Sequence, residues 1–146
     1  MSDAISAAMR RLVFKKANGL CEYCLIYQDD AHFTFQVDHV ISRKHKGLTS
    51  AANLALSCLR CNVAKGTDVG AFVGRPRQIT RLYHPREDTW TDHFRLAGAR
   101  IVALSKIGDA TVQLLELNAA DRLLLRRALL KGGRYPTVEA LAYLRA

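Results

Sequence analysis

The spacing of apolar side chains near the start of the chain predicts a helix. Between Ile5 and Ala17 apolar residues recur at intervals of three and four, and basic residues fill the positions between them. Asn18 and Gly19 follow, and both residue types readily adopt the left-handed conformation that ends many helices. We therefore expect a helix over residues 5–17.

The pattern then changes from helical spacing to alternation. Residues 33–37 alternate apolar with polar side chains and include aromatic and β-branched types, which predicts a strand. Residues 42–50 form a polar, basic loop. The short apolar run at 54–56 fits either a second strand or a turn of helix. Residues 58–66 predict a short helix that stops at Gly66.

The second half of the chain follows a turn-like, glycine-rich segment at residues 66–76. Its patterns predict strands and helices in mixed order, so the expected fold class is α+β. The expected elements are strands at 89–96 and 99–104, a helix at 109–117, a helix capped by Asn118 and stopped by Gly132 and Gly133, and a last helix at 137–144.

Composition agrees with a folded chain and adds no membrane signal. Of the 146 residues, 49% are hydrophobic and 24% are charged, which excludes wholesale disorder. No apolar run approaches the roughly 20 residues that span a bilayer, and no signal peptide pattern is present. We expect one soluble, cytoplasmic domain over residues 1–146, with a core at about 19–68 and a supporting extension at about 77–146.

The chain is strongly basic, with a formal net charge of +9 and a sequence pI near 9.8. Such a charge favours polyanionic partners, of which nucleic acid and anionic membrane are the usual ones. A basic surface without a binding function accounts for the charge equally well. Charge therefore supports a function only if other residues indicate one.

Four cysteines form two C-x-x-C pairs, Cys21 with Cys24 and Cys58 with Cys61. In a reducing compartment two such pairs are explained better by one tetrahedral zinc site than by disulfides. Buried thiols without a metal are the alternative. The pairs are far apart in the sequence, so a folded segment lies between them.

Residues suited to phosphodiester chemistry occur in a fixed order between the two pairs and just beyond. From the N-terminal side the order is C-x-x-C, Asp38-His39, Asn53, C-x-x-C-Asn62 and Lys65-Gly66. This order closely resembles that of the HNH endonuclease family, over residues 21–66. The resemblance implies a ββα-metal core with a structural zinc site, and hydrolysis of DNA by a metal-dependent endonuclease.

The resemblance also implies a role for each residue. His39 would be the general base, since a neutral histidine accepts a proton from water near neutral pH. Asp38 and Asn62 would hold a catalytic Mg²⁺ or Mn²⁺, because these cations prefer hard oxygen ligands. Asn53 would shape the loop and help to hold His39. Many family members have histidine where this chain has Asn62, and an amide oxygen favours Mg²⁺ or Mn²⁺ over softer metals.

Helix and strand geometry sets two requirements for this site. Cys58 and Cys61 share a helix face, and Asn62 lies beside it, so one helix could present thiolates to zinc and an amide to the catalytic cation. Asp38 and His39 are neighbours on a strand and point to opposite sides of it. Both can serve one phosphate only if they lie at a strand end or a bend.

Basic side chains near these residues are candidates for contacts with the DNA backbone. The candidates are Arg43, Lys44, Lys46 and Lys65. An ordinary exposed charge run, or a solvated lysine at a helix end, is the alternative for each. His84 and His93 fit core histidines better than substrate contacts.

The sequence thus predicts a metal-dependent endonuclease that nicks DNA, with zinc as structural metal and Mg²⁺ or Mn²⁺ as catalytic metal. No membrane partner is expected, and no pattern indicates an oligomeric state. The alternatives are a zinc-stabilised nucleic-acid-binding module without catalysis, and a nuclease that acts on RNA or within a larger complex.

Overall fold

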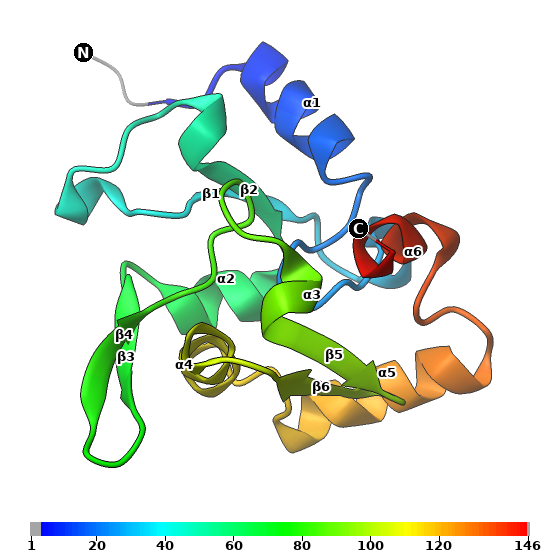
Figure 1. Cartoon of the computed structure of the whole chain (residues 1–146). Coiled ribbons are helices and arrows are strands. Elements are labelled where there is room, and N and C mark those ends of the chain that lie inside the picture. The colour runs from blue at the N-terminus through cyan, green and yellow to red at the C-terminus, as the bar shows by residue number, and fades with distance from the viewer. Residues whose placement is uncertain (1–3, 146) are drawn as a thin grey trace.

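The computed structural model describes residues 4–145, so the two ends of the predicted domain, residues 1–3 and 146, lie outside the described part. Helices and small antiparallel strand pairs alternate along it, which confirms the α+β fold class (Figure 1). The helices are α1 (Ala7–Lys16), α2 (Leu59–Lys65), α3 (Trp90–His93), α4 (Lys106–Leu114), α5 (Ala120–Lys131) and α6 (Val138–Leu144). The strands are β1 (Gln36–His39), β2 (Leu54–Ser57), β3 (Gly70–Val73), β4 (Gln78–Arg81), β5 (Phe94–Ala97) and β6 (Arg100–Ala103).

The first helix forms as predicted. The Ser6 side chain accepts a hydrogen bond from the Met9 backbone N–H and so caps the start of α1. Asn18 and Gly19 end it in the left-handed region, with φ of 53° and 71°. The helix buries Val13 completely and packs against the β1–β2 pair. No helix in the described part is long and apolar enough to cross a membrane.

The central strand pair carries the predicted chemistry. β1 and β2 run antiparallel, so residues 54–56 belong to a strand and not to a turn of helix. β1 begins at Gln36, later than the alternating pattern predicted. The reason is a side chain: the Phe35 backbone N–H donates to Gln28 Oε1 at 2.8 Å and so does not join the strand ladder.

The largest departure from the predicted elements lies between residues 66 and 97. The segment predicted as turns includes β3, which pairs with β4. The predicted strand at 89–96 is instead the short helix α3 followed by β5. Trp90 explains the helix, because its indole N–H donates to the Tyr23 carbonyl at 3.1 Å and its ring packs on Phe94 in the core.

The capping role predicted for Asn118 is wrong, although the helix after it exists. Its amide instead accepts from the Ile101 N–H and donates to the Ile101 carbonyl, and so holds β6. Ala119 occupies the cap position of α5, without a side-chain hydrogen bond. The preceding helix α4 also begins three residues earlier than predicted, because Ser105 caps it.

A buried ion pair ties the C-terminal part to the β1–β2 pair. Glu22 is fully buried and accepts from Arg86, from the Tyr143 hydroxyl at 2.6 Å and from the Leu56 backbone N–H at 2.8 Å. The Arg86 Nε also donates to the Leu54 carbonyl at 3.0 Å. The Glu22 carboxylate thus accepts four hydrogen bonds inside the protein. Removal of one partner of a buried ion pair typically lowers the free energy of unfolding by about 3–5 kcal/mol.

Candidate active site and metal centre

The four cysteine sulfurs come together in the interior. All four Sγ atoms lie within 4.8 Å of one another, and none forms a disulfide. Zinc–thiolate bonds of about 2.3 Å in a tetrahedron place the sulfurs about 3.8 Å apart. The Cys24 and Cys58 sulfurs are 3.8 Å apart. The cluster therefore has the residue types, burial and spacing of a structural zinc site, as predicted.

Local backbone structure explains how the pairs form a cluster. The first pair sits in a tight turn, in which the Leu25 N–H donates to the Cys21 carbonyl and Leu25 has a φ of 66°. The Glu22 N–H donates to the Leu56 carbonyl and fastens this turn to β2. Cys58 caps α2, since its sulfur accepts from the Cys61 N–H at 3.4 Å.

The electrostatic surroundings of the four thiols differ within the cluster. Burial raises the pKa of the Cys21 and Cys61 thiols well above the usual range, since a charged thiolate loses its hydration there. A zinc ion reverses that preference because it is the largest local charge and binds the deprotonated form. Hydrogen bonds from the other cysteines instead lower the pKa of the Cys24 thiol, and a bound metal would favour the thiolate form of the whole cluster.

Asp38 and His39 are the last two residues of β1, so the requirement for a strand end or a bend is met by a strand end. Their side chains point to different sides. Asp38 faces α2, where its Oδ2 lies 3.0 Å from the Lys65 ammonium. The His39 ring lies toward the following loop, with Nε2 at 2.8 Å from the Thr49 hydroxyl. The strand end thus presents a carboxylate and an imidazole as immediate neighbours.

Lys65 lies inside the protein and not on the surface where a phosphate contact was expected. It is 1% exposed, and its ammonium pairs with Asp38 and donates to the His39 carbonyl at 3.0 Å. Burial raises the pKa of Asp38, and the nearby Lys65 charge opposes that shift by favouring the carboxylate. Lys65 therefore joins the C-terminal end of α2 to the end of β1.

Asn62 lies one turn before Lys65 on α2. Residues three apart share a helix face, so Asn62 lies on the side of α2 that Lys65 directs to β1. It is half-buried, and its side-chain amide makes no hydrogen bond with any residue between 4 and 145. An amide oxygen in this position suits a hard divalent cation.

Asn53 shapes the loop after β1, and it does so through the backbone. Its amide donates to the Ile41 and Leu48 carbonyls and accepts from the Ile41 N–H, each at 2.9 Å. The loop is so tight that a Cβ on Gly47 would lie 1.6 Å from the Ile41 carbonyl oxygen. Asn53 thereby fixes the loop at Leu48, and the residue after Leu48, Thr49, contacts His39.

Thr49 is the residue that sequence analysis missed. Its hydroxyl accepts from the Arg43 guanidinium at 3.1 Å and lies against the His39 ring. A threonine in a polar loop has no distinguishing pattern, and only the fold of the loop places it beside the histidine. The only sequence feature related to Thr49 was Asn53, which was predicted to shape the same loop.

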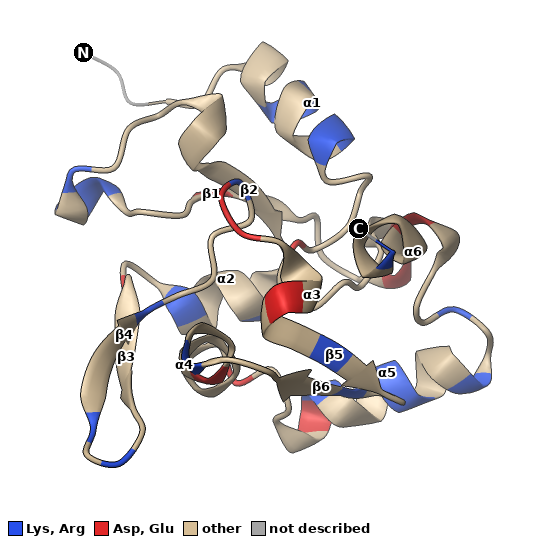
Figure 2. Ribbon diagram, in the orientation of Figure 1, with Lys and Arg blue, Asp and Glu red and all other residues tan. Residues whose placement is uncertain are grey.

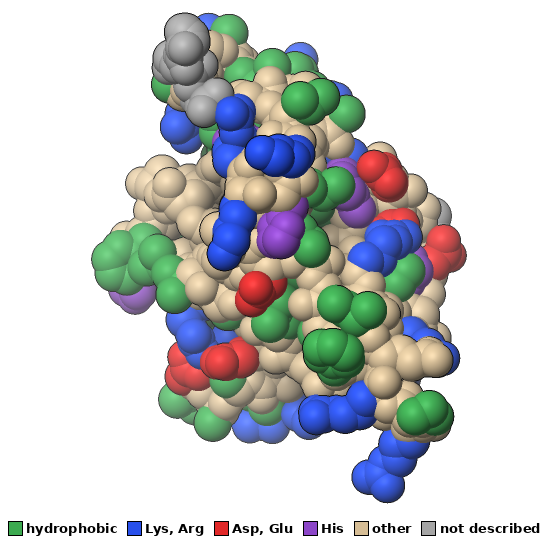
Figure 3. Space-filling view, turned by 90° about the vertical axis from the view of Figure 1, so that its left-hand side faces the viewer, with side chains coloured by type: hydrophobic (Ala, Val, Ile, Leu, Met, Phe, Trp, Pro, Cys, Tyr) green, Lys and Arg blue, Asp and Glu red, His purple; other side chains and the backbone are tan. Residues whose placement is uncertain are grey.

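The basic residues of the loop lie at the surface. Arg43, Lys44 and Lys46 are exposed, and they occupy a short 3-10 turn and its left-handed end. Figure 2 shows this turn as a blue segment at the left extremity of the ribbon. The molecular face on that side carries lysine and arginine side chains next to histidines (Figure 3).

His84 and His93 have structural surroundings. His84 is 6% exposed and accepts from the Arg86 N–H through Nδ1. The His93 Nδ1 lies 2.6 Å from the Ser105 hydroxyl, and its ring contacts Tyr83 and Phe94. His84 is therefore a buried histidine, as sequence analysis favoured, whereas His93 is half-buried and packs at the edge of the core against Tyr83 and Phe94.

Comparison with known proteins shows two similarities. Residues 21–68 match a family model described as HNH endonuclease. The chain is 28% identical over 131 residues to the Septu protein PtuB of Bacillus thuringiensis, and the match covers 88% of the chain and 48% of that protein. The chain thus spans about half the length of this curated relative. No solved structure matches.

We predict that Cys58→Ser lowers the melting temperature and zinc content together, because the free energy of zinc binding is free energy of folding. Serine preserves the cap of α2, so the loss reports the missing ligand and not a missing cap. Calorimetry with metal analysis measures both quantities. Val63→Ser, an exposed change on the same helix, is the control. A Cys58→Ser protein that melts like the wild type would refute the prediction.

Proposed function

We propose that this chain is a metal-dependent endonuclease that nicks DNA, a proposal supported by the match of residues 21–68 to the HNH endonuclease family model. The observation that carries the proposal is the arrangement at the end of β1. There Asp38 and His39 adjoin the helix that bears Asn62, and the zinc cluster includes two residues of the same helical segment. The backbone of β1 thus carries the proposed base and one proposed metal ligand at adjacent positions, between α2 on one side and the loop with Thr49 on the other.

His39 acts as the general base in this proposal. If its Nε2–H donates to the Thr49 hydroxyl oxygen, the basic lone pair is on Nδ1, which takes the proton from the attacking water. The hydroxyl oxygen has two lone pairs and accepts from Arg43 as well. The water oxygen then bonds to phosphorus while the bond to the 3′-oxygen breaks.

Asp38 and Asn62 are the residues that would hold a catalytic Mg²⁺ or Mn²⁺. Such a cation would supply charge neutralisation at the phosphate and at the leaving oxygen. Lys65 occupies one side of the Asp38 carboxylate and keeps it directed toward α2. The second carboxylate oxygen and the Asn62 amide oxygen would then provide the oxygen ligands that these cations prefer.

The exposed turn that carries Arg43, Lys44 and Lys46 would bind the DNA backbone. This turn follows the general base, His39, closely in the sequence, and the Arg43 guanidinium donates a hydrogen bond to the Thr49 hydroxyl. The buried Lys65 has no part in this contact. The net charge of +9 adds long-range attraction to any polyanion.

We predict that the wild type converts supercoiled plasmid to the open circle with Mg²⁺ or Mn²⁺, and that His39→Ala nicks about 10²–10⁴-fold more slowly because the base is missing. His32→Ala, an exposed histidine away from β1, serves as the control. Absence of nicking by the wild type, or equal nicking by His39→Ala, would reject catalysis. DNA binding in EDTA by a protein that also fails to nick when Mg²⁺ or Mn²⁺ is supplied would indicate the binding module, and cleavage of RNA alone would reassign the substrate.

Thr49→Val should lower the cleavage rate at saturating DNA about tenfold to a hundredfold, since a base displaced by about 1 Å loses that much. Valine matches the shape of threonine but lacks the hydroxyl, whereas Thr49→Ser restores it. Single-turnover cleavage and DNA affinity are measured for both variants. Unchanged affinity with a reduced rate is expected for Thr49→Val only. Wild-type rates for Thr49→Val would show that His39 does not need this partner.

A further inference from the structure

We propose that Arg122 is a fifth member of the zinc centre, where its guanidinium neutralises part of the charge of the zinc-bound thiolates. Arg122 lies on α5, outside the residues that match the HNH family model. Retention of the zinc would therefore depend on a segment of the C-terminal extension. The inference rests on the zinc site and not on the proposed nuclease activity.

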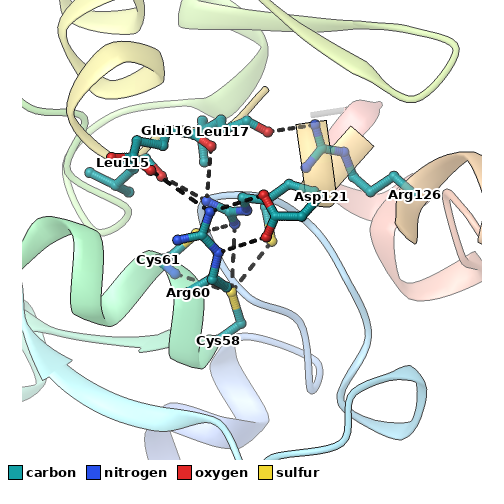
Figure 4. A network of polar contacts seen from close by, with 10 residues as sticks. Cys58, Arg60, Cys61, Leu115, Glu116, Leu117, Asp121 and Arg126 are labelled. Carbon is teal, nitrogen blue, oxygen red and sulfur yellow. Dashed lines mark hydrogen bonds and ion pairs between the residues drawn. The ribbon is translucent and has the colours of Figure 1, made fainter. Parts of the chain in front are cut away.

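The contacts of Arg122 hold it against two of the four sulfurs. Its side chain is buried, and Nη2 lies 2.9 Å from the Cys61 Sγ and 3.7 Å from the Cys58 Sγ. On its other side Nη1 donates to the Leu115 carbonyl at 2.7 Å. Figure 4 shows the cysteine sulfurs and the Leu115 and Glu116 carbonyls converging on one place from opposite sides. The guanidinium is thus fixed in orientation.

Charge balance gives this contact its meaning. Four thiolates and one Zn²⁺ carry a net charge of −2, and burial of an uncompensated charge is expensive. Arg122 brings one permanent positive charge into hydrogen-bond contact with the cluster. The neighbouring Arg60 does not share this task, since it is exposed and pairs with Asp121 and Glu116.

A hydrogen bond to sulfur also changes the chemistry of the ligand. The N–H groups of Arg122 draw electron density from the Cys61 thiolate, which makes that sulfur a weaker nucleophile and a poorer proton acceptor. Zinc loss begins when a ligand is protonated, oxidised or alkylated. Outer partners of metal ligands typically contribute 10–100-fold in metal affinity.

The chain offers a matched control one helical turn away. Arg126 also lies on α5 and is fully buried, and its guanidinium donates to the Ala99 carbonyl at 2.7 Å and the Leu117 carbonyl at 2.6 Å. In Figure 4 it points to Leu117 and away from the cysteines. Arg122 and Arg126 thus make similar contacts with carbonyls, but only Arg122 contacts sulfur.

The test compares zinc retention in the zinc-loaded chain of residues 1–146 and in its Arg122→Met and Arg126→Met variants. Zinc transfer to a chromophoric chelator is followed below the melting temperature of every variant, and the melting temperatures are measured in parallel. We expect both variants to be destabilised, and only Arg122→Met to lose about 10–100-fold in zinc affinity. The zinc affinity of Arg122→Lys should lie between those of the wild type and Arg122→Met, because lysine keeps the positive charge but lacks the planar guanidinium.

Two results would overturn the inference. One is a wild-type zinc affinity for Arg122→Met. The other is an equal loss of zinc affinity in Arg126→Met, which would show that general destabilisation causes the loss. If the methionine variants fail to fold, Arg122→Lys and Arg126→Lys carry the same comparison. A nuclease assay is not needed, so failure of the proposed function would leave this test intact.

Discussion

Four thiols that meet in the interior need a cation before they can all be charged, and most of the structure around the site depends on that constraint. The cysteine sulfurs lie within 4.8 Å of one another and come from the turn after α1 and from the start of α2. Glu22 of that turn is bonded to β2, and Arg122 of α5 contacts the sulfurs. One metal ion would therefore join the turn after α1 to the start of α2, and Arg122 adds α5 to this junction.

This junction also determines where the catalytic candidates stand. α2 carries both a zinc ligand, Cys61, and the candidate metal ligand Asn62, and its last residue reaches across to β1. The buried pair of Lys65 with Asp38 then fixes the helix against the end of the strand. In the proposed mechanism zinc takes no part in hydrolysis. It holds α2 in the position from which Asn62 would bind the catalytic Mg²⁺ or Mn²⁺.

The sequence predicted the parts of the fold that local chemistry specifies. The clustering of the cysteine pairs and the helix that stops at Gly66 follow from spacing and residue type. Tertiary contacts decided the rest. A helix replaced a predicted strand because Trp90 bonds to a distant carbonyl, and a polar loop residue, Thr49, reaches His39 only after the loop folds back. The position of Lys65 at a helix end predicted an exposed side chain, and its ion pair with Asp38 explains why it is buried.

X-ray absorption at the zinc edge of the purified protein tests the central claim most directly, since it reports the number, type and distance of the ligands. The account predicts one zinc per chain with four sulfur ligands at about 2.3 Å. A first shell with nitrogen or oxygen ligands, or a folded protein that holds no zinc, would contradict it. Either result would mean that zinc does not hold α2 against the turn after α1, and it would remove the proposed link between the zinc site and the position of Asn62.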